Sequence, residues 1–216
     1  MTRTVWLVRH GNRADFADPT WARAAMRPDD PPLAESGIVQ SLALARQLRG
    51  QRIAHLFSSP FLRAIETAHF IAAATDLRVK VEPGLSDWLS PAWFPQPPTL
   101  LSCAELVQRF SRIDHAYKVR GTARYGEAGD EALARSAVTA RRLVEDFRGN
   151  LLMVGHGASI LGAVAGLLGV GPEKIRPTLH TLPYGSAVKL VGQRTGWVIE
   201  DTTKTAPVPA RTAERG

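Results

Sequence analysis

The sequence predicts a three-layer α/β/α sandwich with a mostly parallel central sheet. Short apolar runs typical of buried strands alternate with amphipathic helical segments through most of the 216 residues. Repeated strand, crossover and strand units favour a parallel sheet with helices on both faces. The length suits one domain, which we expect over residues 1–201.

The first expected strand covers residues 5–8, a run of β-favouring apolar side chains that stops at Arg9, His10 and Gly11. Ligands of such sheets bind beyond the carboxyl ends of the strands. Arg9 and Arg13, beside a glycine that lets the backbone approach closely, form a pocket suited to an anion. His10 is the candidate reactive side chain of this pocket.

Residues 14–32 form a proline-bearing segment that is longer than an ordinary connection from strand to helix. We expect either a lid-like loop beside the pocket or a plain surface excursion. The next helix is expected from about residue 33 to residue 49, and Gly50 fits its end. Its apolar face is predicted to consist of Ile38, Leu42, Ala45 and Leu48.

A second strand over residues 53–57 leads into a helix that runs to about residue 75. Ser59 is the expected N-cap and Pro60 the expected first helical residue, so the unpaired helix amides would face the strand end. Arg63 lies in the first turns. Because a guanidinium and a helix N-terminus can hold the same phosphoryl oxygens, this segment is a second candidate for anion binding.

A third strand is expected over residues 78–81, and residues 89–101 are expected to form a second lid-like loop. The prolines of this loop cannot sustain a helix or a central strand. The loop either forms a wall that holds a leaving group or packs on the domain through its own aromatic side chains. Trp88, Trp93 and Phe94 favour an aryl or otherwise bulky leaving group.

Later elements follow the same alternation. Helices are expected over residues 103–117, 130–147 and 158–168, and strands from residue 150 and over residues 186–191 and 197–200. Gly162 and Gly166 predict close packing of the last of these helices on the sheet. His156 lies between a strand and a helix, in the same kind of position as His10 and Arg63. Residues 202–216 have the composition of a flexible tail.

The composition limits the class of protein. The formal net charge of +7 favours anionic ligands, but the arginines are scattered, which argues against a nucleic-acid surface. Cys103 is the only cysteine and no signal peptide precedes the first strand, so we expect a cytoplasmic protein. The longest apolar run, near residues 158–170, is too short to span a bilayer. A homodimer is compatible with the sequence, although no pattern points to one.

Four motifs follow one another along the chain: Arg9-His10-Gly11, Ser58-Ser59-Pro60-x-x-Arg63-x-x-x-Thr67-Ala68, Glu82-Pro83-Gly84-Leu85-Ser86-Asp87-Trp88 and Val154-Gly155-His156-Gly157. Together they resemble the motifs of the histidine phosphatase superfamily, the phosphoglycerate-mutase-like proteins, over residues 4–168. Arg13 makes the first motif more similar to the acid-phosphatase and Sts-type phosphatase branches than to the mutases. Gly155 stands where serine or alanine is common in the family.

The resemblance implies a phosphoglycerate-mutase-like fold and a metal-independent, cofactor-free phosphomonoesterase that acts through a phosphohistidine intermediate on His10. It implies that Asp87 is the proton donor, although the family has a glutamate there, and Glu82 is the alternative. Glu127 and Arg135 fall where related phosphatases have a polar pair that supports the pocket. The residues expected to hold the phosphoryl oxygens are Arg9, Arg13, Arg63 and His156, and His156 is also expected to be catalytic.

The expected substrate is a phosphorylated small molecule or a phosphopeptide. One alternative is phosphotransfer of the phosphoglycerate mutase type, against which Arg13 and the aromatic loop argue. Another is a noncatalytic phosphate-binding or scaffold protein on the same fold, with Asp87 and Gly155 as signs of drift. Binding of nucleic acid rests on net charge alone.

Overall fold

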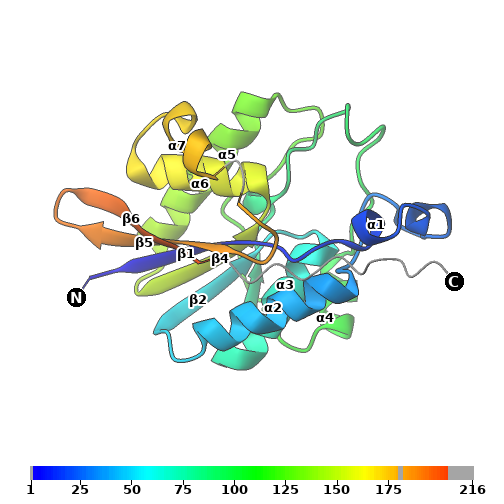
Figure 1. The fold of residues 1–216 in the computed structure, drawn as a ribbon, viewed down its shortest axis with the longest axis horizontal. Coiled ribbons are helices and arrows are strands. Elements are labelled where there is room, and N and C mark those ends of the chain that lie inside the picture. The colour runs from blue at the N-terminus through cyan, green and yellow to red at the C-terminus, as the bar shows by residue number, and fades with distance from the viewer. Residues whose placement is uncertain (1, 180–181, 204–216) are drawn as a thin grey trace, which may run out of the picture.

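The computed structural model describes residues 2–179 and 182–203, and its six described strands form one mixed sheet. The strand order is β3-β2-β4-β1-β5-β6 (Figure 1). Four strands are parallel and occupy one side of the sheet: β1 (Thr4–Arg9), β2 (Ile53–Ser58), β3 (Val79–Val81) and β4 (Asn150–Gly155). The hairpin of β5 (Ala187–Gln193) and β6 (Gly196–Thr203) adds antiparallel strands at β1. The predicted α/β fold with a mostly parallel sheet is confirmed.

Helices cover both faces of the sheet (Figure 1). One layer contains α2 (Glu35–Leu48), α3 (Leu62–Thr75) and α4 (Cys103–Arg109), and the other contains α5 (Gly129–Asp146), α6 (Gly157–Leu168) and α7 (Pro172–Leu179). Successive strand side chains point to opposite faces, so Trp6 and Val8 pack in the core of the first layer and Val5 and Leu7 in that of the second. The sequence patterns did not predict α7.

Residues 14–32 contain two short helical turns, α1 (Ala14–Ala17) and the 3-10 helix η1 (Trp21–Arg23). The two ends of this segment are held together, because Arg13 and Leu33 form an isolated antiparallel bridge and the Ala14 amide donates to the Pro32 carbonyl. A further 3-10 turn, η2 (Pro83–Leu85), follows β3. The segment therefore leaves and rejoins the domain at one place beside the end of β1.

The helix predicted over residues 103–117 is wrong after Arg109, where α4 ends. The chain then runs beside β3: the Val79 amide donates to the Arg112 carbonyl, and the Asp114 amide donates to the Val79 carbonyl. Because β3 is an edge strand, its outward backbone groups need partners. Pairing with this segment satisfies them and ends the helix early.

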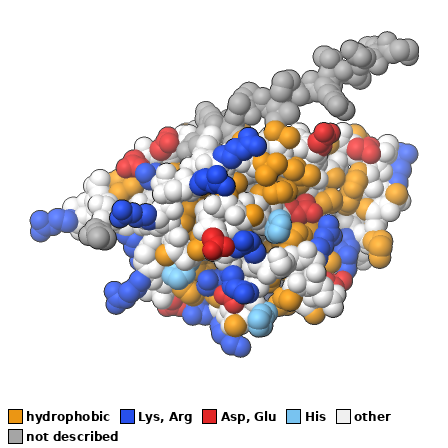
Figure 2. Space-filling model, turned by 90° about the horizontal axis from the view of Figure 1, so that it is seen from below, with side chains coloured by type: hydrophobic (Ala, Val, Ile, Leu, Met, Phe, Trp, Pro, Cys, Tyr) orange, Lys and Arg blue, Asp and Glu red, His pale blue; other side chains and the backbone are white. Residues whose placement is uncertain are grey.

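The prediction for the apolar face of α2 is correct for Ala45 and Leu48 and wrong for Ile38 and Leu42. Leu44, Ala45 and Leu48 are buried, whereas Ile38 and Leu42 are each 38% exposed. A Cβ at Gly37 would lie 2.1 Å from the Asn12 carbonyl oxygen, so this turn of α2 packs directly on the chain after β1 and sets the rotation of the helix. Apolar side chains consequently gather on the outer surface of the layer that contains α2 (Figure 2).

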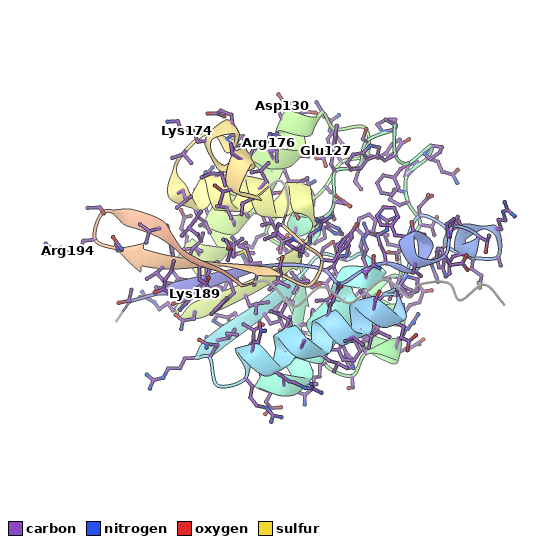
Figure 3. The ribbon with its side chains drawn as sticks, in the orientation of Figure 1. Glu127, Asp130, Lys174, Arg176, Lys189 and Arg194 are labelled. Carbon is purple, nitrogen blue, oxygen red and sulfur yellow. The ribbon has the colours of Figure 1, made fainter. Side chains whose placement is uncertain are left out.

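The charged surface and the helix lengths give two further findings. Basic side chains such as Lys174 and Arg176 on α7 and Lys189 and Arg194 on the β5–β6 hairpin project separately from one another (Figure 3). Within residues 2–179 and 182–203, every helix is too short or too polar to span a bilayer.

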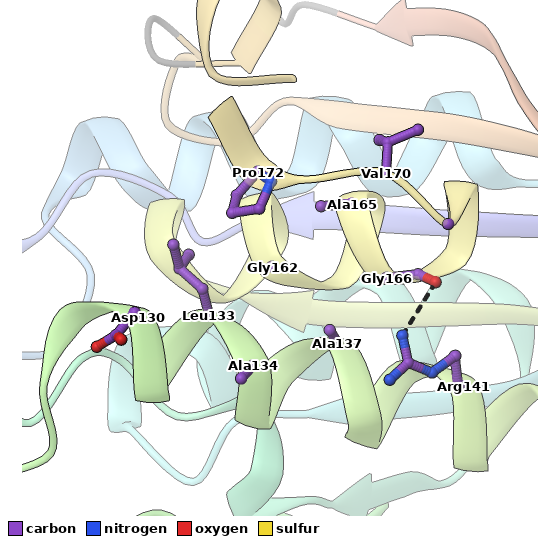
Figure 4. Close-up of a pocket in the computed structure, with 11 residues that line it drawn as sticks. Asp130, Leu133, Ala134, Ala137, Arg141, Gly162, Ala165, Gly166, Val170 and Pro172 are labelled. Carbon is purple, nitrogen blue, oxygen red and sulfur yellow. Dashed lines mark hydrogen bonds between the residues drawn. The ribbon is translucent and has the colours of Figure 1, made fainter. Parts of the chain in front are cut away.

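Gly162 and Gly166 pack on α5 and not, as predicted, on the sheet. A Cβ at Gly162 would lie 2.4 Å from the Leu133 carbonyl oxygen, and one at Gly166 would lie 2.5 Å from the Ala137 side chain. The small residues therefore let α5 and α6 approach closely, and Arg141 bridges them by donating to the Gly166 carbonyl (Figure 4). A groove of about 480 Å³ runs along this contact, and none of the predicted site residues lines it.

The final strand is longer than predicted. β6 extends to Thr203 because Thr202 and Thr203 pair with Val188 and Ala187 of β5. The predicted flexible tail over residues 202–216 is thus wrong for its first two residues, and residues 204–216 lie outside the described part of the chain.

Candidate active site

The carboxyl ends of β1, β2 and β4 bring together three segments that are far apart in the sequence. Arg9 pairs with Gly155, and Ser58 pairs with Val154. The His10 amide donates to the Gly155 carbonyl over 3.1 Å, which continues the ladder by one residue. His10 and His156 follow these strand ends, and their ring centroids are 5.0 Å apart.

Thr67 fixes the distance between His10 and α3. Its hydroxyl donates to the Arg63 carbonyl over 2.8 Å and accepts the Gly11 amide over 3.1 Å. The backbone at Gly11 also approaches α2 so closely that a Cβ there would lie 2.5 Å from the Gly37 carbonyl oxygen. A glycine and a threonine therefore tie the first motif to the helix that carries Arg63.

His10 is a buried, neutral imidazole whose Nε2 carries the lone pair. Its Nδ1 lies 2.7 Å from the Gly11 carbonyl, which can only accept, so Nδ1 bears the hydrogen. Nε2 accepts from Nε of Arg63 over 3.3 Å. Burial, and then the charges of Arg63 and His156, hold the pKa of His10 well below its usual value. The unprotonated nitrogen is therefore available as a nucleophile.

Arg63 is fully buried and has one donor without a partner. Its Nη2 pairs with Oδ2 of Asp87 over 2.9 Å, whereas Nη1 has no hydrogen-bond partner among the described residues. Nε of Arg9 is likewise buried without a partner there, while its Nη1 donates to the Leu182 carbonyl. A buried guanidinium donor without a partner is costly, so both groups are suited to receiving an anion.

His156 lies on the other side of Arg63. Its Nε2 lies 2.8 Å from the Ser59 hydroxyl, and its Nδ1 lies 3.3 Å from both Nη2 of Arg63 and Oδ2 of Asp87. Burial, followed by the charges of Arg63, Arg13 and Arg9, lowers the pKa of His156 well below its usual value. The second histidine is therefore also neutral in this structure.

The contact between Ser159 and His156 explains why position 155 is a glycine. A Cβ at this position would lie 2.5 Å from the Ser159 hydroxyl. That hydroxyl accepts the His156 amide over 2.8 Å at the start of α6 and donates to the His156 carbonyl. Glycine thus leaves room for the contact that holds His156, and packing alone accounts for glycine at this position.

The predicted N-cap of α3 is wrong. The helix begins at Leu62 after Phe61, whose side chain makes no capping hydrogen bond. The Ser59 hydroxyl accepts the Phe61 amide over 3.4 Å, just before the helix, and lies 2.8 Å from Nε2 of His156. The Leu62 amide donates to Oδ1 of Asp30 over 2.7 Å. Sequence reasoning missed Asp30 because it lies in an irregular segment 32 residues away.

Asp87 and Glu82 occupy different environments. Asp87 lines the cavity, and its Oδ1 accepts the Trp88 amide while Oδ2 faces Arg63 and His156. Glu82 is fully buried and does not line the cavity. Its carboxylate accepts from the Tyr117 hydroxyl and from the amides of Gly84, Arg120 and Gly121. Glu82 thus organises the backbone behind the site, and Asp87 faces the cavity.

Arg135 and Glu127 hold the segment that carries Asp87. They form a nearly buried ion pair, with Oε1 of Glu127 2.5 Å from Nη2 of Arg135. The same guanidinium donates to the carbonyls of Gly84, Ser86 and Asp87. Neither residue lines the cavity, and the pair contacts the backbone of the segment that carries Asp87. The supporting role that the family resemblance implies stays a prediction.

Arg13 lines the cavity, but its guanidinium is already paired. Nε and Nη2 donate to the two carboxylate oxygens of Asp15 over 2.8 and 2.6 Å. The guanidinium carbon also lies 4.5 Å from the ring centroid of Phe16. Arg13 lowers the pKa values of His156 and Arg63, so it acts on the site through its charge.

The cavity above these residues has a volume of about 530 Å³. Residues 14–32 supply one wall with Phe16, Pro28 and Asp29. In the loop of residues 89–101, Phe94 is buried against Phe61, whereas Trp93 is 60% exposed at the cavity. Phe94 thus packs on the domain, as one interpretation of this loop expects, whereas the role of the loop in holding a leaving group stays a prediction. Tyr184, which the sequence analysis did not single out, lies 5.3 Å from the His10 ring.

The described residues contain no group of three or more histidine, cysteine or acidic side chains placed to hold a metal ion. The positive charges at the site come from arginines.

Replacing Asp30 by asparagine is expected to change how stability depends on pH. Asp30 is 1% exposed, and burial raises its pKa from 3.8 to about 6. The folded state therefore binds this proton more tightly than the unfolded state, and wild-type stability falls as pH rises from about 4 to about 6. Asparagine keeps the acceptor for Leu62 but does not titrate. Over this pH range, the free energy of unfolding of the variant, measured in urea, should rise by about 1 to 3 kcal/mol relative to that of wild type.

The difference between the two proteins is the quantity to measure. The lowered pKa values of buried His10 and His156 make both proteins less stable as pH falls below about 6.5. This contribution cancels in the difference. Asp29→Asn, at the neighbouring half-buried position, is the matched control. A difference between Asp30→Asn and wild type that stays constant with pH would contradict the assignment.

Comparison with known proteins agrees with the geometry. The family model described as the histidine phosphatase superfamily (branch 1) matches residues 5–205. The ecdysteroid-phosphate phosphatase of Drosophila melanogaster is 27% identical over 225 residues, which cover 85% of this chain and 30% of that protein. A probable phosphoglycerate mutase, GpmB of Yersinia pestis, is 29% identical over 209 residues, which cover 94% of this chain and 93% of that protein. The chain thus spans about a third of the first relative.

Among solved structures, the ecdysone phosphate phosphatase of Bombyx mori, in complex with tungstate, is similar to this chain with a TM-score of 0.77. The sequences are 24% identical, and the match covers 99% of this chain and 96% of that one. At this identity the likeness establishes the shared fold.

Proposed function

The chain belongs to the histidine phosphatase superfamily, and on this basis we propose that it hydrolyses phosphomonoesters through a phosphohistidine intermediate on His10. One observation carries the proposal. His10, whose Nε2 is unprotonated, lines the cavity together with Arg9 and accepts from the fully buried Arg63. Each of the two guanidinium groups has one buried donor without a partner among the described residues. A nucleophile beside free cationic donors is the arrangement that phosphoryl transfer requires.

In the first step, Nε2 of His10 attacks phosphorus in line with the leaving oxygen, and the bond from phosphorus to that oxygen breaks. Arg9 and Arg63 hold the equatorial oxygens, where negative charge sits in the transition state. Asp87, in its protonated form, donates its proton to the leaving oxygen. The products of this step are the free alcohol, phosphohistidine and the Asp87 carboxylate.

In the second step, the Asp87 carboxylate takes a proton from water, and the resulting hydroxide attacks phosphorus. The bond from phosphorus to Nε2 breaks, which releases inorganic phosphate and regenerates His10. A bound phosphate dianion beside His156 favours its imidazolium, so His156 becomes a donor to the phosphoryl group once substrate is present. Arg13 adds positive potential from the cavity wall.

The arginines supply the positive charge that a divalent cation supplies in other phosphatases, so the proposed reaction uses neither a metal nor another cofactor. The substrate is proposed to be a phosphorylated small molecule or a phosphopeptide. The relative named as an ecdysteroid-phosphate phosphatase makes phosphates of bulky alcohols suitable first substrates. Cys103 is an exposed free thiol, which suits a reducing compartment, and we propose that the protein acts in the cytoplasm.

The test is turnover of purified protein on p-nitrophenyl phosphate and on 3-phosphoglycerate. We expect release of p-nitrophenol and inorganic phosphate in equal amounts, because the intermediate is hydrolysed by water. Conversion of 3-phosphoglycerate into 2-phosphoglycerate without release of phosphate would instead support the mutase alternative. Binding of inorganic phosphate without turnover of either ester would support a noncatalytic phosphate-binding protein.

A further inference from the structure

Two aromatic side chains stand at the mouth of the cavity with most of their surface in water. Phe16 is 61% exposed and Trp93 is 60% exposed, and both line the cavity. They come from different segments, the one after β1 and the one after η2. Exposed aromatic rings of this size at a concave site are typical of a surface that an apolar ligand covers.

The rings form a continuous path from the nucleophile outward. The Tyr184 ring lies 5.3 Å from His10 and 6.3 Å from Phe16. Arg9 packs on Tyr184 at 4.1 Å from its centroid, and Arg13 packs on Phe16 at 4.5 Å. A group attached to a phosphoryl bound at His10 would therefore extend over Tyr184 toward Phe16.

Trp93 is held in place from behind. Its ring centroid lies 5.2 Å from that of Trp88, whose Nε1 donates to the Glu127 carbonyl over 2.8 Å. Glu127 in turn is fixed by its ion pair with Arg135. The exposed indole is thus backed by the same residues that support Asp87, so it lies on a fixed wall although its outer face is in water.

The charges around the mouth disfavour a leaving group that is itself anionic. Asp15 and Asp29 both line the cavity. Asp15 binds Arg13 through both carboxylate oxygens, so the guanidinium nearest Phe16 already has a carboxylate partner. Among the described lining residues, the remaining arginine is Arg9, which lies at the phosphoryl end beside Tyr184. A carboxylate near Phe16 would face acids without a free cation to pair with.

We propose that Tyr184, Phe16 and Trp93 form a subsite for an uncharged, apolar leaving group larger than a single ring, and that Asp15 and Asp29 exclude phosphomonoesters whose leaving group carries a carboxylate. This inference rests on the proposed phosphatase function and names the class of ester that the site prefers. The cavity volume of about 530 Å³ lies in the range of sites for drug-sized ligands.

The experiment compares 1-naphthyl phosphate, glycerol 2-phosphate and 3-phosphoglycerate as substrates of wild type, Phe16→Ala and Trp93→Ala. Each variant should raise KM for 1-naphthyl phosphate about threefold to tenfold, the scale of one lost aromatic contact. KM for glycerol 2-phosphate and inhibition by inorganic phosphate should not change. Met26→Ala is the matched control, because Met26 is 93% exposed in the same segment as Phe16 but does not line the cavity.

The effect of Asp15 and Asp29 on anionic leaving groups is measured separately. Wild type should prefer 1-naphthyl phosphate to 3-phosphoglycerate, and this preference should shrink as salt rises, because salt screens the repulsion between the ligand carboxylate and the partly buried Asp15 and Asp29. Asp29→Asn should raise kcat/KM for 3-phosphoglycerate about twofold to fivefold.

The outcomes separate the subsite from the function. If no phosphomonoester is hydrolysed, the proposed function fails. If all three esters are hydrolysed with similar kcat/KM, or if the aromatic variants raise KM equally for glycerol 2-phosphate, the function stands and the subsite is refuted. Thermal unfolding of each variant checks that lost affinity does not reflect a misfolded loop.

Discussion

Replacing His10 by alanine is expected to lower kcat for p-nitrophenyl phosphate by at least about 10⁴-fold, the scale seen when an enzyme loses its nucleophile. His10 lines the cavity, and its Nε2 is the unprotonated imidazole nitrogen, which accepts from the buried Arg63. Without it, no phosphohistidine forms. Rapid quenching during turnover of a ³²P-labelled ester should therefore show acid-labile label on wild type and none on the variant.

The control for this prediction is His115→Ala, because His115 is exposed and lies in a turn away from the cavity. That variant should keep wild-type kinetics. His10→Ala should still bind inorganic phosphate, since Arg63 and Arg9 remain. Acid-labile label or substantial turnover in His10→Ala would remove His10 from the mechanism, whereas loss of phosphate binding would indicate a disturbed fold.

Asp87→Asn is expected to slow hydrolysis of an alkyl phosphate by about 10²- to 10⁴-fold, the usual range for loss of a general acid. The effect should be much smaller for the first step with p-nitrophenyl phosphate, because p-nitrophenolate leaves without protonation. The second step still lacks its general base, so phosphohistidine should accumulate and appear as a burst of p-nitrophenol.

Glu82→Gln distinguishes the two candidate acids. The Glu82 carboxylate is saturated by four donors from the backbone and Tyr117, outside the cavity. Its loss should lower the melting temperature, because buried donors lose a charged acceptor. It should not make the rate depend more steeply on the leaving group. A steeper dependence for Glu82→Gln than for Asp87→Asn would reverse the assignment.

Local patterns in the sequence were sufficient to locate the candidate site residues that follow the ends of strands. Each of His10, Arg63 and His156 follows the end of a buried strand, and a parallel sheet brings such ends to one edge. The supporting pair Glu127 and Arg135 came only from resemblance to a family, because no periodicity connects the pair to Asp87.

The errors share a physical cause. Residues 110–117 carry helical spacing, but the unpaired edge of β3 offers backbone hydrogen bonds that end α4. Ser59 is a residue type that favours the N-cap, but its hydroxyl accepts only the Phe61 amide before the helix and contacts His156, while Asp30 accepts the Leu62 amide. In each case a partner distant in the sequence outcompetes the local preference, which is small for a cap or a few helical residues.

The sequence by itself determined the alternation of strands and helices, the order of the four motifs and the chemical character of a candidate anion site built from arginines and histidines. These follow from side-chain spacing and residue type, which are local properties. Only the tertiary structure decided which nitrogen of His10 is free, that Asp87 and not Glu82 faces the cavity, that Asp30 binds the start of α3 and that Tyr184 joins Phe16 beside the nucleophile. Those facts depend on distances between segments up to 174 residues apart, from His10 to Tyr184, which packing of the two helical layers on the sheet sets and no local pattern encodes.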